Sequence, residues 1–317
     1  PKALELFRAE AEKGNILAKA DYAKMILQDN TEEALELFQS SIDNGWPIDN
    51  LVDYACSIHD DYSKSIKLLK MAADRGNLNG CLKYGLMLYN GNGCSVNKNE
   101  GLEYIKMSAD KGYIPAMSCY GSLILNDDDD IDIPSTENLN DLTSILNAFQ
   151  MLLSSTLRKP RDKTEGVKYL KMAADRGDMK AMGQMVNCLY HGIGTQVNKK
   201  EAARYLKILA DKGNPLSIYT YGLALLQGDG VPSIKSEAIK YLRKSADEYG
   251  NAESMKDLGI MYYEGHGIQQ NCAEAEKYFK LAIEKGNSTS MFLYGLMLAR
   301  GDGIPFNKDE AIKYFQM

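Results

Sequence analysis

The chain contains 317 residues, of which 44% are hydrophobic and 25% are charged, a length and composition typical of a soluble protein of about two domains. Its formal net charge is −6, and lysine and arginine are interspersed with aspartate and glutamate. Without a basic stripe, nucleic acid and anionic membranes are not expected as partners. No apolar run approaches the roughly 18 residues of a spanning helix, and no signal-peptide pattern is seen, so we expect no membrane insertion.

Glycines recur along the chain at a nearly constant distance. Each closes a segment whose small and apolar residues are spaced by three and four positions, which predicts an amphipathic helix that ends at glycine. The glycines are Gly14, Gly45, Gly76, Gly112, Gly177, Gly213, Gly250 and Gly286, separated by 31, 31, 36, 65, 36, 37 and 36 residues. A period of this size predicts a stack of similar helical repeats, each covering its neighbour.

The N-terminal part begins with a partial repeat at 1–14 and continues with repeats over 15–126. After each closing glycine we expect a second helix, marked by a tyrosine and a small residue as in Tyr84-Gly85 and Tyr120-Gly121. A glycine there lets another helix approach closely, because it has no Cβ. The longer repeats end in a Gly-x-Gly loop, which the first two repeats lack.

The 65-residue step contains an inserted segment, 127–160. It begins with four aspartates, Asp127 to Asp130, that predict an acidic loop. An apolar stripe over 139–157 then predicts an amphipathic helix, formed by Leu139, Leu142, Ile145, Leu146, Phe149, Leu152, Leu153 and Leu157. Two roles stay open for this helix, because it could pack on its own repeats or dock a partner.

The repeats resume over 161–317, where the last one is truncated. The stretch 199–230 contains the whole pattern: a helix from Ala202 to Gly213, a second helix over 216–226 and a turn at Gly228-Asp229-Gly230. Because the chain begins at Pro1, inside a helix pattern and without methionine, we expect it to be part of a longer protein. We predict a single repeat domain over 1–317.

The recurring pattern of small-x-x-Tyr-[Leu/Phe]-x-x-[Ala/Ser]-Ala-x-x-Gly, then Tyr-Gly and Gly-x-Gly, resembles the Sel-1-like repeat family, relatives of the tetratricopeptide repeats. The resemblance covers nearly the whole chain. It implies an all-α fold, a right-handed α-solenoid (superhelix) of about eight stacked antiparallel helix pairs. It also implies a role as an adaptor or scaffold for protein complexes.

No group of residues predicts catalysis or a cofactor, and we expect none. The histidines His59, His191 and His266 lie in different repeats, so a metal site is not expected. The Gly-x-Gly loops lack both the preceding strand of a dinucleotide site and the Gly-Lys-Ser/Thr ending of a phosphate loop. The six cysteines show no ligand spacing, and as free thiols they favour a reducing compartment such as the cytoplasm.

By its resemblance to tetratricopeptide folds, the second helix of each pair should line a concave groove. Positions three before, one after and four after its glycine would then face a partner, and aromatic anchors there are a usual source of binding energy. The predicted groove residues are Tyr89, Tyr190, Tyr219, Leu223, Leu226, Ile260, Tyr263, Phe292 and Leu296. Alternatively, tight curvature lets these residues pack on one another.

Two functions follow as hypotheses. The leading one is a noncatalytic protein–protein interaction scaffold that binds a partner peptide or domain in this groove. The alternative is a regulatory or targeting arm of a larger enzyme whose catalytic domain lies outside these residues. End-to-end self-association is also expected, because incomplete terminal repeats expose helix faces that a neighbour would cover.

Overall fold

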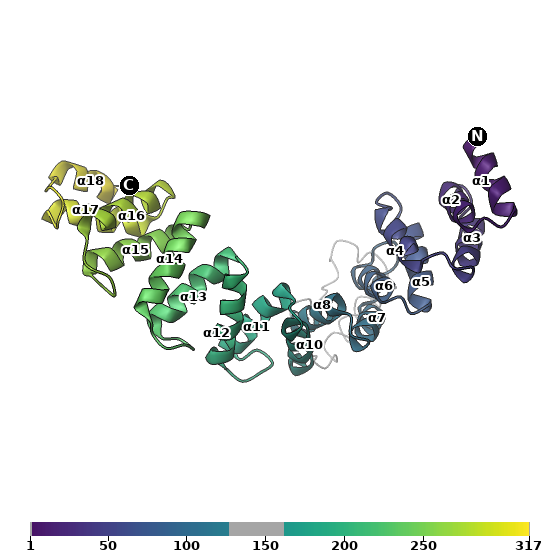
Figure 1. The fold of residues 1–317 in the computed structure, drawn as a ribbon, viewed down its shortest axis with the longest axis horizontal. Helices are drawn as coiled ribbons and strands as arrows, with labels where there is room; N and C mark the ends of the chain where they lie inside the picture. Colours follow the sequence, from purple (N-terminus) through teal and green to yellow (C-terminus); the bar gives the residue numbers. More distant parts are fainter. Residues whose placement is uncertain (1, 127–161, 317) are drawn as a thin grey trace, which may run out of the picture. The chain divides into compact units, whose positions relative to one another are not determined.

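The computed structural model describes residues 2–126 and 162–316 (Figure 1). Within these two ranges the chain forms 17 α-helices and no strand. The helices belong to two compact units, Pro1–Asp178 and Met179–Met317, called unit 1 and unit 2 below. In each unit, most helices that follow one another in the described chain pack together. This is the arrangement that the sequence repeats predict.

Unit 1 contains α1 (Lys2–Glu12), α2 (Ile16–Ile26), α3 (Thr31–Asp43), α4 (Ile48–Ser57), α5 (Tyr62–Asp74), α6 (Leu78–Asn90), α7 (Lys98–Asp110), α8 (Ile114–Leu125) and α10 (Lys163–Asp175). Unit 2 contains α11 (Met179–His191), α12 (Lys199–Asp211), α13 (Pro215–Gln227), α14 (Lys235–Tyr249), α15 (Ala252–Glu264), α16 (Cys272–Glu284), α17 (Ser288–Arg300) and α18 (Lys308–Gln316). The second helices of the repeats are α2, α4, α6, α8, α11, α13, α15 and α17.

Asparagine side chains begin many of these helices. The Oδ1 atom of Asn214, for example, accepts a hydrogen bond of 2.9 Å from the backbone N–H of Ser217 at the start of α13. At α12, Asn198 accepts from the backbone N–H of Glu201, and the Asn198 amide donates to the Glu201 carboxylate. These caps pair backbone groups that the first helical turn leaves unsatisfied, which helps to set where each helix begins.

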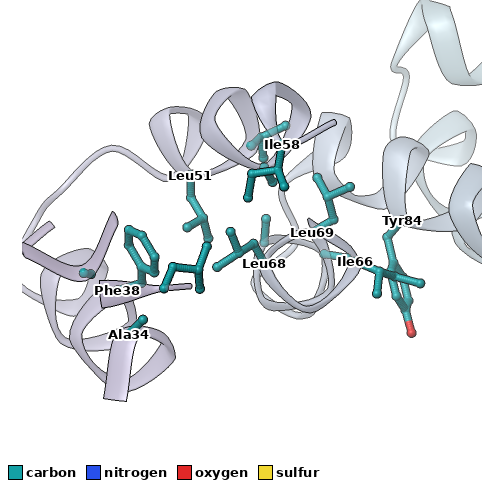
Figure 2. Packing of buried hydrophobic residues seen from close by; sticks show 14 of the residues in the cluster. Ala34, Phe38, Leu51, Ile58, Ile66, Leu68, Leu69 and Tyr84 are labelled. Carbon is teal, nitrogen blue, oxygen red and sulfur yellow. The ribbon is translucent and has the colours of Figure 1, made fainter. Parts of the chain in front are cut away.

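From Ala20 to Leu88, the core of unit 1 is a cluster of buried apolar side chains that passes from one repeat to the next (Figure 2). Phe38 stacks on Trp46 with ring centroids 5.8 Å apart, and Leu51 and Leu68 are fully buried beside it. Because consecutive helices share these residues, no repeat buries its apolar face alone.

Two glycines allow α6 and α7 to approach closely. A Cβ atom at Gly85 would lie 2.5 Å from the carbonyl oxygen of Gly101, and a Cβ atom at Gly101 would lie 2.6 Å from that of Gly85. Real side chains do not tolerate these distances. At Gly85, the glycine of the Tyr-Gly motif is therefore required by backbone-to-backbone contact, which is the close approach that the sequence predicts.

In several repeats, the tyrosine of the second helix meets the tyrosine of the first helix of the next repeat. The ring pairs lie edge to face with centroids 4.8 to 5.0 Å apart, in Tyr84–Tyr104, Tyr120–Tyr169, Tyr221–Tyr241 and Tyr294–Tyr314. Such pairs contribute about 0.5–1.5 kcal/mol beyond the burial of their area. Where Leu258 replaces the tyrosine, Tyr262 lies one turn later and stacks on Tyr278 at 5.7 Å. The period of the sequence thus reflects one repeated contact.

The predicted inserted segment, 127–160, lies outside the described residues. On either side of it, α8 and α10 pack together in unit 1 as a second helix packs on the next first helix elsewhere. The prediction of a single repeat domain over 1–317 stays a prediction.

Candidate partner-binding surface

The predicted groove residues lie on one side of the second helices. Tyr89 is on α6 of unit 1, and the other eight, called the second-helix row below, are on α11, α13, α15 and α17 of unit 2. In α13 the core side holds Ile218 and Tyr221, whereas Tyr219, Leu223 and Leu226 are half-buried on the other side. Every residue of the row is half-buried except Phe292, which is 55% exposed.

A group of charged residues surrounds the first tyrosine of α13. The Tyr219 hydroxyl donates to Asp257 Oδ2 at 3.2 Å, and Lys256 Nζ lies 3.3 Å from Asp257 Oδ1 and 2.5 Å from Glu253 Oε2. Burial, and then the neighbouring Asp257, raise the pKa of Tyr219 to about 12. Burial also raises the pKa of Asp257. We call Glu253, Lys256 and Asp257 the carboxylate cluster; with both acids ionised its net charge is −1.

The last tyrosines of two second helices face aspartates in Gly-Asp-Gly loops. The Tyr263 hydroxyl donates to Asp302 Oδ2 at 2.6 Å. Lys199 Nζ lies 5.9 Å from the centroid of the Tyr190 ring and forms an ion pair of 2.9 Å with Asp229. Burial and then Asp229 raise the pKa of Tyr190. These contacts tie each tyrosine to the loop of the next repeat.

A pocket opens between α11 and α13. It has a volume of about 340 Å³ and is lined by Gly183, Val186, Asn187, Tyr190, His191, Leu206, Leu209, Leu216, Ser217 and Thr220. A Cβ atom at Gly183 would meet nothing within 4 Å. At the rim, Leu216 is 71% exposed. We call this space the Gly183 pocket; apolar side chains form most of its wall, and a few polar groups stand among them.

The structure brings together part of the predicted surface. Tyr219, Leu226, Ile260 and Tyr263 all pack against one core cluster of unit 2, while Tyr89 lies in unit 1, near Lys98. That these residues bind a partner stays a prediction.

Sequence reasoning missed the loop aspartates near these tyrosines, of which Asp302 accepts a hydrogen bond from Tyr263 and Asp229 pairs with Lys199 beside Tyr190. A signal was present: the Gly-x-Gly loops that follow Tyr190 and Tyr263 by one repeat contain Asp229 and Asp302 at the middle position, whereas the loop that corresponds to Leu226 contains His266.

Other chemical groups on the described chain are scattered. No cluster of three or more His, Cys, Asp or Glu side chains suited to a metal ion occurs within 2–126 and 162–316. The three histidines are exposed, and His266 Nδ1 lies 2.7 Å from Glu264. All six cysteines are free thiols, two of them buried and one exposed.

Comparison with known families confirms the origin of the repeats. The family model described as "Sel1 repeat" matches residues 21–46, 59–77, 78–113, 148–178, 179–214, 215–249, 252–287 and 288–317. The chain belongs to the Sel1 repeat family. Its fold is an all-α solenoid of about eight repeats. One Sel1 match starts at residue 148, inside the segment that the sequence predicts to be an insert.

Two solved Sel1-type structures share this fold. One is a protective antigen present in uropathogenic Escherichia coli strains and described as displaying an SLR fold; it is 19% identical, with a TM-score of 0.69 over 99% of this chain and 63% of its own. The other is a Sel1 repeat protein from Oxalobacter formigenes, 22% identical, with a TM-score of 0.59 over 98% of this chain and 85% of its own. This Sel1 chain therefore spans less than two thirds of the length of the E. coli antigen. A search of curated proteins found no match.

Sel1 repeats generally serve as protein–protein interaction modules and are generally noncatalytic. The Gly183 pocket lies where two neighbouring Sel1 repeats, 179–214 and 215–249, meet. Across the described residues, no helix is both long and apolar enough to span a membrane.

Proposed function

We propose that this Sel1 repeat chain is a noncatalytic scaffold that binds a segment of a partner protein along the second-helix row of unit 2. The observation that carries the proposal is the Gly183 pocket, which opens on the side of α11 that the sequence predicts to face a partner. Its lining includes Tyr190 from the second-helix row and the exposed Leu216.

The surface offers enough apolar area to drive binding. Leu216 and Phe292 are 71% and 55% exposed, and full burial of a side chain of this kind contributes about 1.5–3 kcal/mol. The half-buried residues between them, such as Leu226 and Ile260, already pack on the core. They therefore lose little conformational entropy when a partner covers them.

The test selects peptides from a phage-displayed library of random 12-residue sequences against the full chain. Binding of the selected peptides is then compared between the wild type and the double variant Leu216→Ser/Phe292→Ala. Because both side chains are more than half exposed, the helical signal should not change, while binding should weaken by about 10- to 100-fold.

The matched control is Val197→Ser, since Val197 is 58% exposed but does not line the pocket. Peptides that bind the double variant as well as the wild type, or a library that yields no specific binder, contradict the proposed function.

We also infer end-to-end association of copies of this chain through α18. Phe306 and Phe315 are 66% and 45% exposed, whereas Phe279, the counterpart of Phe315 in α16, is 1% exposed. Sedimentation velocity at rising concentration should show dimers that Phe315→Glu removes, and a monomer at every concentration contradicts this inference.

A further inference from the structure

The Gly183 pocket lies where α11 has a glycine at a position that holds a larger side chain in the other second helices of unit 2. The residue three positions before the motif glycine is Tyr219 in α13, Lys256 in α15 and Phe292 in α17. In α11, where Val186 replaces that glycine, the corresponding residue is Gly183. In the neighbouring pair, Tyr219 of α13 fills the corresponding space and bonds to Asp257 of α15. Thr220 of α13, the counterpart of Asp257, lines the Gly183 pocket, where no such side chain arrives.

The apolar wall of the pocket suits an aliphatic side chain. The volume of about 340 Å³ is at the lower end for ligand pockets, which span roughly 300–1,000 Å³. Leu206 and Leu209 of α12 line it together with Val186 of α11, and Tyr190 and Leu216 complete the apolar part of the wall. The Thr220 hydroxyl donates to the backbone carbonyl of Leu216 at 2.7 Å and can still accept a hydrogen bond from a peptide N–H, while the Asn187 amide can both donate to and accept from a peptide backbone.

The carboxylate cluster lies on the other side of α13, toward α15. Glu253 and Asp257 both pair with one cation, Lys256, and the Asp257 side chain is 16% exposed. Two carboxylates with one ammonium group leave a negative charge in a partly desolvated place, where an added cation is attracted more strongly than in water. Since α13 separates it from the pocket, the cluster lies about one helix diameter, roughly 10–12 Å, from it.

We propose, on the basis of the proposed function, that the occupant is a partner segment with two features. A leucine, isoleucine or methionine enters the Gly183 pocket, and a lysine or arginine about 10–12 Å away pairs with Glu253 and Asp257. The aliphatic side chain takes the place that Tyr219 has in the next pair, and the basic side chain neutralises the remaining charge of the cluster. The partner is therefore a basic, aliphatic protein segment.

The test uses peptides selected on the wild-type chain, synthesised with a fluorescent label and measured by anisotropy. Gly183→Leu fills the pocket from within, and because a Cβ atom at Gly183 meets nothing within 4 Å, the fold should be kept. We expect this variant to weaken binding at least tenfold. Asp257→Asn should weaken binding about three- to tenfold, and an alanine in place of the basic peptide residue should have the same effect.

The losses of binding free energy caused by Asp257→Asn and by the alanine in the peptide should not add, because each change removes the same ion pair. Wild-type binding should also decrease as the salt concentration rises, while binding to Asp257→Asn should depend less on salt.

The outcomes separate this inference from the proposed function. Peptides that bind Gly183→Leu as tightly as wild type but lose binding to Leu216→Ser/Phe292→Ala leave the scaffold in place and overturn the inference. Selected peptides without a common aliphatic and basic residue overturn it as well. Peptides insensitive to every one of these variants contradict the proposed function itself.

Discussion

Two glycine-to-alanine changes on second helices should affect stability in opposite directions. In Gly85→Ala the new methyl group would lie 2.5 Å from the Gly101 carbonyl oxygen and 2.7 Å from Ile105 Cγ1, whereas ordinary contact begins at 3.4 Å. Helices α6 and α7 must therefore separate, and such overpacking costs typically about 1–3 kcal/mol. In Gly183→Ala the methyl group enters open space.

Both variants replace glycine with alanine inside a helix, which by itself stabilises by about 0.5–1 kcal/mol. This contribution cancels when the two are compared, so the remaining difference of about 1–3 kcal/mol measures the close approach of α6 and α7. Gly183→Ala should be slightly more stable than the wild type, and Gly85→Ala less stable.

The measurement is urea unfolding followed by far-UV circular dichroism, together with hydrogen exchange of the amides in α6 and α7. Hydrogen exchange is needed because repeats can open locally before the whole chain unfolds. Faster exchange in α6 and α7 of Gly85→Ala, and no change there in Gly183→Ala, is the expected result. Equal effects of the two variants on stability would refute the reasoning.

Three further predictions concern single groups. Tyr263→Phe removes the hydrogen bond to Asp302 and should lower the free energy of unfolding by about 1 kcal/mol in urea titrations; an unchanged value would show that water replaces this bond. The Asp61 carboxylate accepts hydrogen bonds from Ser63 and Lys64, which lower its pKa from 3.8 to about 2. Its stabilising effect should therefore be complete above about pH 4 and lost as the pH falls through 2. In thermal denaturation, the difference in melting temperature between Asp61→Asn and the wild type should shrink as the pH is lowered from 4 to 2. Cys119 has a pKa raised by burial to about 11, so it should react with a maleimide at pH 7 far more slowly than the exposed Cys56, as mass spectrometry of labelled peptides will show.

Much of the architecture could be predicted because it repeats. The period of the glycines indicates the helix pairs, and the recurring tyrosines mark the contact between consecutive repeats, seen in Tyr84–Tyr104 and Tyr221–Tyr241. The side of α13 that holds Tyr219 was also predictable, since helical spacing separates it from the core residue Tyr221.

The predicted row could not be completed from spacing alone. Whether a position is filled or vacant depends on the side chain of the neighbouring repeat, which one helix cannot reveal. Tyr219 is held by Asp257, 38 residues away, and the Gly183 pocket exists because its walls come from α11, α12 and α13 together. The sequence does not distinguish Gly85, which contacts the backbone of a neighbouring helix, from Gly183, where the missing side chain leaves a space.

The sequence by itself determined that this protein is a stack of Sel1 helix pairs, because each repeat contains the residues that must touch within and between pairs. Only the tertiary structure decided which of the remaining positions are occupied, because a pocket depends on the distances among side chains from several helices. The shared positions of the repeat thus account for stability, and the vacant position at Gly183 accounts for the surface that we propose to recognise a partner.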